Sequence, residues 1–511
     1  MPLYLNYSVG NAIAFNGAAF SCISFIVFLA STQPFYLAEV LGFKHKDNIG
    51  AAIGTLGVID ELAAIVFAPL IGALCDKITA GGKISGSRAT IVMGFTIIGV
   101  SFLCYGKLAS HFYPDLAIFR TLFALGVTST MSMVTVMFTE ISNSDLDILS
   151  SLSGIKRSFT RQEDDPESIQ RLLSNDSTED LDLNPTPPTR KTGRYAAMMG
   201  ISTGLGAIFA VSFFLTLPAR LQTHFPELSN KDALKLAYSS IGVLSIITGA
   251  ILYFFIYAKD NNAALAYQQT HISTTGTPTT GYFKLLKHGL MISKRNTRVQ
   301  LSYVGAFVAR STAVSTGIFV PLLVYNFFYK SGICGGEEAT GPGKIPSKQD
   351  CHEGYIFAAI LTGVGQTIAL VTAPIWGTLI DYKRLGNTRC LFLASLCGVL
   401  GCFGLCFHGI GENSDAYDPR NITSFIMVGL LGISHIGTVM SSMSLLSSVV
   451  SETKDSISIG SISGMYSLSG GLGILLITSV GGKWSDSWIH APFFILGTFH
   501  IILLSLSIRL W

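Results

Sequence analysis

Long apolar stretches separated by polar segments recur along nearly the whole chain. Each stretch holds about 20 residues or more, and a helix that rises about 1.5 Å per residue needs that length to cross the roughly 30 Å hydrocarbon core of a membrane. The pattern therefore predicts twelve membrane-spanning helices, near residues 12–37, 51–75, 88–109, 115–139, 195–217, 234–257, 299–327, 354–380, 389–410, 422–448, 459–480 and 490–510.

Composition supports a membrane protein and excludes other classes. Of the 511 residues, 49% are hydrophobic and only 13% are charged, which is about half the charged fraction of a soluble domain. The net charge is +3 and the basic residues are scattered through short connections, so no basic surface for a nucleic acid is expected. We predict an all-α polytopic membrane protein that is embedded in the lipid bilayer. We do not expect it to bind a nucleic acid.

The distribution of Lys and Arg predicts how the chain is oriented. If both termini are cytoplasmic, 21 of the 34 basic residues fall in cytoplasmic segments and 11 in segments on the opposite side. Lys and Arg are enriched in the cytoplasmic loops of membrane proteins. We therefore expect both termini to be cytoplasmic.

Two connections are longer than a turn between helices requires. Residues 141–193 are rich in Ser, Thr, Asp and Pro, which is typical of a disordered loop. Residues 259–298 join two halves of the chain. The predicted divisions are helices 1 to 4 in 1–140, the cytoplasmic loop in 141–193, helices 5 and 6 in 194–258, the central cytoplasmic linker in 259–298, and helices 7 to 12 in 299–511.

An internal repeat is the most specific signal. The pattern A-P-x-x-G-x-L-x-D occurs at 68–76, near the end of the second predicted helix, and again at 373–381, near the end of the eighth, 305 residues later. Helices 5 and 11 share a weaker match between 197–206 and 464–473. Both matches pair equivalent helices of two six-helix units, as a duplicated bundle requires.

The repeated carboxylates, Asp76 and Asp381, stand where their helices are expected to leave the membrane on the cytoplasmic side. A carboxylate there can interact with the positive N-terminal end of a neighbouring helix and with nearby cations. Such contacts can favour one of two global conformations. The cations are Arg88 after the first copy and Arg384 and Arg389 after the second. The alternative is that these basic loops only determine topology.

The pair of G-x-L-x-D sequences followed by basic residues resembles motif A of the major facilitator superfamily, with Gly72, Asp76, Gly377 and Asp381 in the motif's positions. The inserted residues 79–82 lengthen the first loop relative to the family pattern. The resemblance covers essentially the whole chain and implies two pseudo-symmetric six-helix bundles. It also implies a secondary transporter that opens to one face of the membrane at a time.

Three further short sequence segments resemble a sparsely characterised fungal branch of this superfamily. They are residues 307–310, 435–442 and 464–475. This resemblance implies a vacuolar or other internal membrane rather than the plasma membrane, and it implies no known substrate.

Ionisable side chains inside membrane spans are costly, so each is a functional candidate. Asp60 and Glu61 are adjacent in the second predicted helix, where neighbouring positions point about 100° apart, so they cannot share one face. Glu61 shares its face with Gly72, and we expect it to be the inward-facing carboxylate. Its counterpart in the repeat is Gln366, which cannot titrate.

Two arginines lie inside predicted helices, Arg310 in the seventh and Arg120 in the fourth. Arg310 could pair with Glu61, bind an anionic substrate, or extend its long stem to the cytoplasmic interface. Arg120 resembles the arginine of the family's motif B, which implies a functional role. A structural role at the opposite interface is its alternative.

Three further polar residues within the spans are candidates. His435 could titrate near neutrality, although a lone His among Gly and Ser more often serves packing. Asn16 and Tyr466 are candidate lining residues of a polar path.

Candidate modifications lie in the connections. Cys334 and Cys351 share one polar loop and could form a disulfide if that loop faces an oxidising compartment. Ser158 and Ser177 in the loop 141–193 are candidate phosphorylation sites, because basic residues flank the first and acidic residues follow the second. A plain solvated linker is the alternative interpretation.

These observations predict a monomeric secondary transporter of a small solute, with proton coupling through Glu61 as a conditional addition. The alternative is a non-transporting sensor that signals through the Ser-rich loop. An enzyme is not expected, since the sequence contains no metal-binding spacing, nucleophile elbow or phosphate-binding loop in a suitable context. We expect neither a cofactor nor a metal.

Overall fold

The structure is a computed structural model. It describes residues 7–42, 46–81, 85–142, 192–225, 227–256, 291, 296–331, 352–382, 384–407, 418–453, 459–485 and 487–510. Ser158, Ser177, Cys334 and Cys351 lie outside the described residues, as do most of the two long connections.

The N-terminal half contains six long helices among the residues that the structure describes. They are α1 (Val9–Phe35), α2 (Lys46–Gly81), α3 (Gly86–Lys107), α4 (Ala117–Ser142), α7 (Thr192–Phe209) and α9 (Asn230–Phe255). Short π-helical segments extend three of them, namely η1 (Tyr36–Val40), η2 (Phe112–Leu116) and η3 (Ala210–Phe214). The short helix α8 (Leu217–His224), which the sequence pattern does not predict, begins with a proline in its first turn and leads into α9.

The C-terminal half repeats this arrangement with six long helices in its described part. They are α12 (Thr297–Lys330), α13 (His352–Asp381), α14 (Gly386–Phe407), α15 (Ile422–Thr453), α16 (Ile459–Leu476) and α18 (Ala491–Arg509). The segments η7 (Ile477–Gly481) and α17 (Gly482–Ser485) continue α16.

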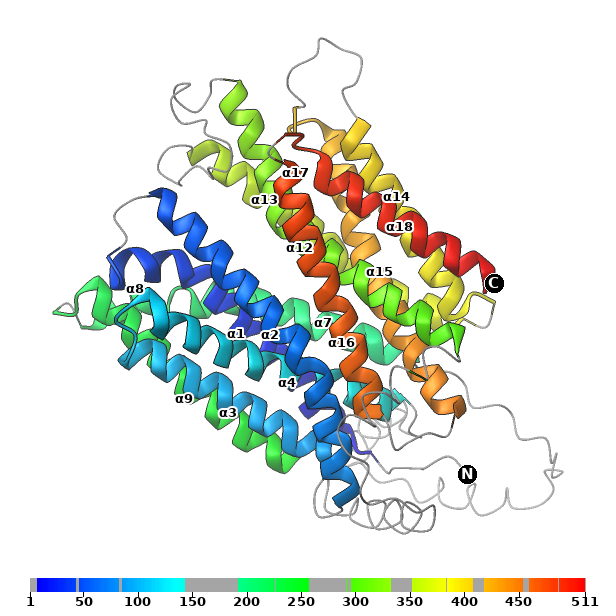
Figure 1. Cartoon of the computed structure of the whole chain (residues 1–511), viewed down its shortest axis with the longest axis horizontal. Helices are drawn as coiled ribbons and strands as arrows, with labels where there is room; N and C mark the ends of the chain where they lie inside the picture. The colour runs from blue at the N-terminus through cyan, green and yellow to red at the C-terminus, as the bar shows by residue number, and fades with distance from the viewer. Residues whose placement is uncertain are drawn as a thin grey trace, which may run out of the picture.

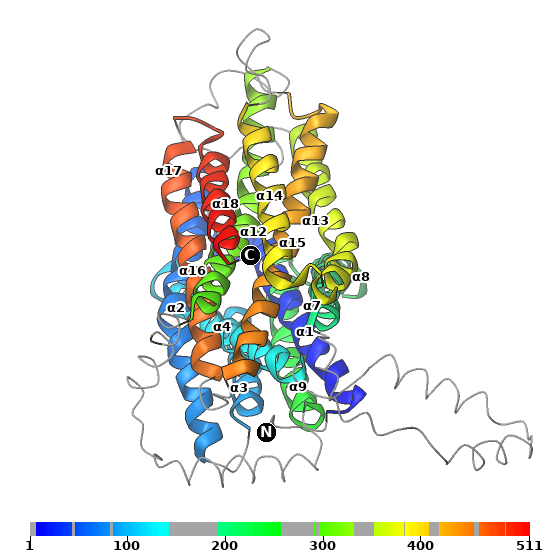
Figure 2. The same cartoon turned by 90° about the vertical axis from the view of Figure 1, so that its right-hand side faces the viewer.

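Twelve helices in the described part of the chain are long and apolar enough to cross a membrane, which confirms the predicted number and class of element. Figure 1 shows them as two bundles, with the blue-to-green helices of the first half grouped apart from the green-to-red helices of the second. Figure 2, turned by 90°, shows α2 of the first half beside α16 of the second. The predicted fold of two six-helix bundles is therefore confirmed.

Within each bundle, glycine allows helices to cross closely. In the first half, a Cβ on Gly99 of α3 would lie 2.6 Å from the carbonyl oxygen of Gly242 in α9. In the second half, a Cβ on Gly432 of α15 would collide with the backbone of Gly365 in α13. Small residues play this role in membrane proteins because lipid tails provide no hydrophobic force between helices, so close packing must hold them together.

Aromatic side chains fill the interior of the first bundle. Phe28, Phe102 and Tyr238, from α1, α3 and α9, pack with ring centroids 5.2 to 5.8 Å apart. The hydroxyl of Tyr238 lies 2.8 Å from that of Thr32 and the hydroxyl of Tyr36 donates to the carbonyl of Tyr105, so both polar tips are satisfied.

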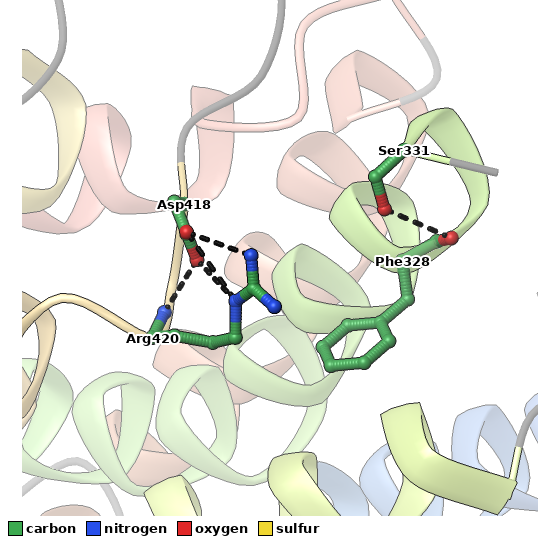
Figure 3. Close-up of polar contacts among 4 residues, drawn as sticks. All are labelled: Phe328, Ser331, Asp418 and Arg420. Carbon is green, nitrogen blue, oxygen red and sulfur yellow. Dashed lines mark hydrogen bonds and ion pairs between the residues drawn. The ribbon is translucent and has the colours of Figure 1, made fainter. Parts of the chain in front are cut away.

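One end of the second bundle carries an ion pair outside the membrane spans (Figure 3). Arg420 donates to Asp418 from its backbone, at 2.9 Å, and from its guanidinium, at 3.0 to 3.3 Å. The guanidinium also lies 5.2 Å from the ring centre of Phe327 in α12. Burial raises the pKa of Asp418 and the hydrogen bonds from Arg420 lower it, with a net result below its usual value.

Candidate functional site

Asp76 caps a helix of the other half. Its two carboxylate oxygens each accept a backbone N–H at 2.7 Å, one from Gly460 and one from Ser461, and the Ser461 hydroxyl donates at 2.5 Å. Gly460 and Ser461 form the first turn of α16, whose N–H groups have no partner within the helix. Asp76 is 8% exposed, so this is a buried charge held by oriented donors and by the positive end of a helix.

Asp381 makes the equivalent contact in the opposite direction. It accepts the backbone N–H groups of Gly193, at 2.7 Å, and Arg194, at 3.0 Å, at the start of α7. The guanidinium of Arg194 lies 4.0 Å away and adds a cation. The two motif aspartates therefore each join one half of the molecule to the other. We call the end of the molecule that contains them the aspartate side.

The motif glycines allow these contacts to form. A Cβ on Gly72 would collide with the carbonyl of Gly460, and a Cβ on Gly377 would lie 2.8 Å from that of Gly193. α2 therefore crosses α16, and α13 crosses α7, at backbone contact. The motif combines a glycine that permits the crossing with an aspartate, four residues later, that caps the crossed helix.

The basic motif residues bind within their own halves. Arg88 donates to the carbonyl of Tyr253, and its guanidinium lies 4.1 Å from the ring centre of the same residue. Arg389 donates to the carbonyl of Arg384, and both of these side chains are exposed. The ion pair of Asp381 in this conformation is with Arg194 of the other half.

A second group of residues lies between the halves, deeper within the spans. Glu61 of α2 is half-buried, and its Oε2 would lie 3.7 Å from a Cβ on Gly471 of α16. Arg310 of α12 packs its aliphatic stem on the adjacent Gly470, where a Cβ would lie 2.7 Å from the arginine Cγ. One glycine pair of α16 thus positions an acidic group from one half and a basic group from the other.

Neither of these two charged groups is satisfied by a residue that the structure describes. Among the residues that the structure describes, Glu61 and Arg310 form no ion pair with each other within 4.0 Å, and neither has a hydrogen-bond partner. Their charges still act on each other across the gap. The charge of Arg310 also acts on His435 of α15 and Tyr466 of α16. We call Glu61, Arg310, His435 and Tyr466 the central site.

Tyr466 is fixed in this site by its own hydrogen bond. Its hydroxyl lies 2.8 Å from that of Ser442 in α15, and the residue is 6% exposed. It stands one helical turn before Gly470, on the same face of α16. His435 is half-buried. The central site therefore combines two charges, an imidazole and a phenol.

Asp60, the neighbour of Glu61, has a separate role. It forms an ion pair with Arg120 of α4, whose Nε donates to Oδ1 at 2.7 Å and whose second nitrogen contacts Oδ2. Gln33 of α1 accepts a third hydrogen bond from Arg120 at 3.0 Å. Asp60 and Arg120 thus neutralise each other inside the first bundle, which leaves Glu61 as the carboxylate facing the second half.

The remaining candidates lie apart from the central charges. Asn16 of α1 accepts from the hydroxyl of Ser202 in α7 at 3.0 Å and donates to the carbonyl of Ala12 at 2.9 Å, so it joins two helices of one bundle. Gln366 is exposed on α13. No group of His, Cys, Asp and Glu residues able to hold a metal occurs in the described part of the chain.

Sequence reasoning missed the partners of the candidates it named. Gly460 and Gly193, which receive the two motif aspartates, stand at equivalent positions of the repeat between α7 and α16, four residues before the matched segments at 464 and 197. Extending that weaker alignment by one turn would have pointed to them. Nothing in the sequence distinguishes Gly470 and Gly471 from the other glycines of α16.

Comparisons with known proteins give the class. The family model described as Major Facilitator Superfamily matches residues 186–478, which is more than half of the chain. No curated protein matches the sequence. The structure is similar to that of the proton:xylose symporter XylE bound to 6-bromo-6-deoxy-D-glucose, with a TM-score of 0.58 and 11% identity over 98% of this chain and 96% of that one. A double tryptophan mutant of XylE gives the same TM-score with 12% identity over 97% and 94%.

The chain belongs to the major facilitator superfamily. At such low identity the likeness to XylE demonstrates a shared fold and nothing about substrate. The family places this protein among secondary transporters.

Proposed function

We propose that this protein is a secondary active transporter that moves a small solute by alternating access, with the central site between its two halves as the place of binding. The observation that carries the proposal concerns two charged residues, Glu61 and Arg310, which come from different halves and approach adjacent glycines of α16. Neither has a hydrogen bond or ion pair with a residue that the structure describes. Substrate sites of this class lie near the middle of the membrane, at the interface of the repeats.

The contacts between halves support alternating access. The helix caps of Asp76 and Asp381 and the contacts of Gly72 and Gly377 all lie on the aspartate side. Breaking these four contacts would separate the halves there. In the orientation favoured by the basic residues, the aspartate side is cytoplasmic, so we interpret this conformation as closed to the cytoplasm.

Proton coupling through Glu61 is the mechanistic part of the proposal. A carboxylate between the halves, exposed to one face at a time, can carry a proton between them. Protonation would remove its attraction to Arg310 and thereby change the energy of bringing the halves together. A sensor that does not transport is not adopted, because the family and the similar structures are those of transporters.

The test is transport in vesicles that contain the purified protein. Uptake or efflux of a labelled solute should respond to an imposed pH gradient, and Glu61→Gln should remove that response. Glu39→Gln, which changes an exposed carboxylate in η1, serves as the control and should leave the response intact. If the flux through the unmodified protein does not depend on pH, proton coupling is contradicted, but transport is not. The absence of flux for every solute tested, with intact folded protein, would contradict the proposed function.

Location, assembly and domain divisions are also proposals. We propose that the protein is a monomer in a vacuolar or other internal membrane, with cytoplasmic termini and with the divisions at 141–193 and 259–298 given above. A fluorescent fusion observed with organelle markers tests the location, and protease cleavage in sealed vesicles tests the side on which the two long connections lie.

A further inference from the structure

Arg310 is a charged group that the protein leaves unpaired. It stands well inside a membrane-spanning helix, yet it has neither a hydrogen bond nor an ion pair with any residue that the structure describes. Its side chain is exposed, so its five N–H donors face an accessible space. An unpaired guanidinium within a membrane span is costly and calls for a partner.

The stem of Arg310 packs on Gly470 of α16, next to Gly471, which Glu61 of the first half approaches. The charge of Arg310 acts on Glu61 of α2 and Cys22 of α1, both from the first half. It also acts on His435 of α15 and Tyr466 of α16, from its own half. Because α16 packs against α12 on one side and α2 on another, we place the guanidinium where the two halves come together.

The contrast with Arg120 shows that the missing partner is specific to Arg310. Arg120 also lies within the spans, and there the chain supplies Asp60 and Gln33 as acceptors. For Arg310 the chain supplies no acceptor among its described residues, although Gly470 holds the stem of the side chain in place. The guanidinium is thus positioned but not neutralised, as expected of a group that awaits a ligand.

We propose that Arg310 binds the carboxylate of a small organic anion, which is the solute carried by this protein. This inference rests on the proposed function and adds the substrate class to it. A guanidinium matches a carboxylate with two parallel hydrogen bonds, and this fit is far stronger in a site shielded from water. The carbonyl and hydroxyl groups of a neutral solute would leave the charge of Arg310 unmatched.

Glu61 completes the charge balance. The charged groups that act on it are Asp60 of its own helix, which Arg120 of α4 neutralises, and Arg310 of α12. The adjacent segment of α16 contributes Tyr466 and no charged group. Empty, the site contains one negative and one positive charge. Loaded with an anion on Arg310 and a proton on Glu61, it again has no net charge, so we expect one proton to accompany each monovalent anion without net transfer of charge.

The experiment measures ligand-induced thermal stabilisation of the purified full chain in detergent. The probes are lactate, succinate and inorganic phosphate, the neutral amides lactamide and succinamide, and alanine, which carries a carboxylate together with an ammonium group. We expect a saturable rise of the melting temperature with at least one carboxylate and none with its amide. Stabilisation by alanine but not by lactate would indicate that the carboxylate bound by Arg310 belongs to a zwitterionic solute. A response to phosphate alone would overturn the proposal.

Variants then test the residue. Arg310→Gln should weaken the response about tenfold or more, because it removes charge-assisted hydrogen bonds. Arg310→Lys keeps the charge but not the paired geometry and should give an intermediate affinity. Gly470→Ala, which displaces the arginine stem, should weaken binding without changing a charge. Arg420→Gln, at the ion pair outside the spans, is the matched control and should bind as the unmodified protein does.

Three outcomes would overturn the inference: amides that stabilise as well as their acids, binding that survives Arg310→Gln unchanged, or no response to any anion in the panel. Each differs from a failure of the proposed function. If the protein carries a neutral solute in a Glu61-dependent way, the proposed transport function holds and the organic anion is wrong. If a carboxylate binds at Arg310 but no flux is measured, the binding site holds and the transport function is wrong.

Discussion

Ser142 and Ser447 form a hydrogen bond with each other through their hydroxyl groups, and they are 305 residues apart, as are Asp76 and Asp381. They come from the fourth long helix of each half, α4 and α15, and they meet between the two halves. Both are buried, and they belong to the ends of α4 and α15 that lie on the aspartate side. The contact can exist only while the two halves are together at this end.

This contact provides a direct measure of the closed conformation. With the nine native cysteines replaced by serine, Ser142→Cys combined with Ser447→Cys should form a disulfide rapidly under mild oxidation. Ligands or variants that open the aspartate side should slow the reaction. Failure of the pair to react at all would contradict the arrangement of the halves described above.

Removing a helix cap should open the aspartate side. Asp76→Asn replaces one of the two acceptor oxygens by an NH2 group, which cannot accept the backbone N–H that it faces. Leaving that buried donor unsatisfied costs about 1–2 kcal/mol. We expect the closed population to fall by roughly 5- to 30-fold relative to the open one. The measurement is the cross-linking rate of the cysteine pair. Asp381→Asn should act in the same direction. Asp232→Asn should not, because Asp232 lies in the first turn of α9, where its carboxylate accepts the hydroxyl of the N-cap Ser229 away from the interface.

A side chain at the motif glycine should also oppose closure. Gly72→Ala places a methyl group against the backbone of Gly460, which must move away at a cost of about 1–3 kcal/mol. Slower cross-linking of the cysteine pair is expected. Gly57→Ala in the same helix, where a Cβ would have no heavy atom within 4 Å, is the matched control. Equal rates in the two variants would contradict the close crossing of α2 and α16.

The pair of Asp60 and Arg120 should contribute to stability rather than to the central site. Asp60→Asn leaves a buried guanidinium without its counterion, which costs about 3–5 kcal/mol. A lower melting temperature in detergent is expected. The double variant Asp60→Asn with Arg120→Gln should recover part of the loss, because no uncompensated charge remains. Additive losses would show that the two side chains act independently.

The ion pair of Asp418 and Arg420 should have only a small, pH-dependent effect. The pKa of Asp418 is lowered in the folded protein, so its contribution is present at neutral pH and is lost as the pH falls through the folded value, below about pH 4. The pair is exposed, so its contribution should be small. The melting temperatures of the unmodified protein and Asp418→Asn should differ slightly at pH 7, and the difference should shrink as the pH falls below about 4.

Local sequence determined the membrane-spanning helices and the repeat. Continuous apolar runs must form helices in lipid, because each backbone group needs a partner within its own segment. The duplicated A-P-x-x-G-x-L-x-D likewise showed that Asp76 and Asp381 are equivalent, since equivalence is a property of the chain alone.

Only the tertiary structure decided what these residues contact. Helical periodicity separates the faces of Asp60 and Glu61, but the positions of α4 and α16 determine that Asp60 meets Arg120 while Glu61 faces the second half. The partner of Asp76 is the first turn of a helix nearly 400 residues later. Contacts between bundles depend on how two large bodies are placed, and that placement comes from close packing and hydrogen bonds along whole helices, which no local pattern encodes.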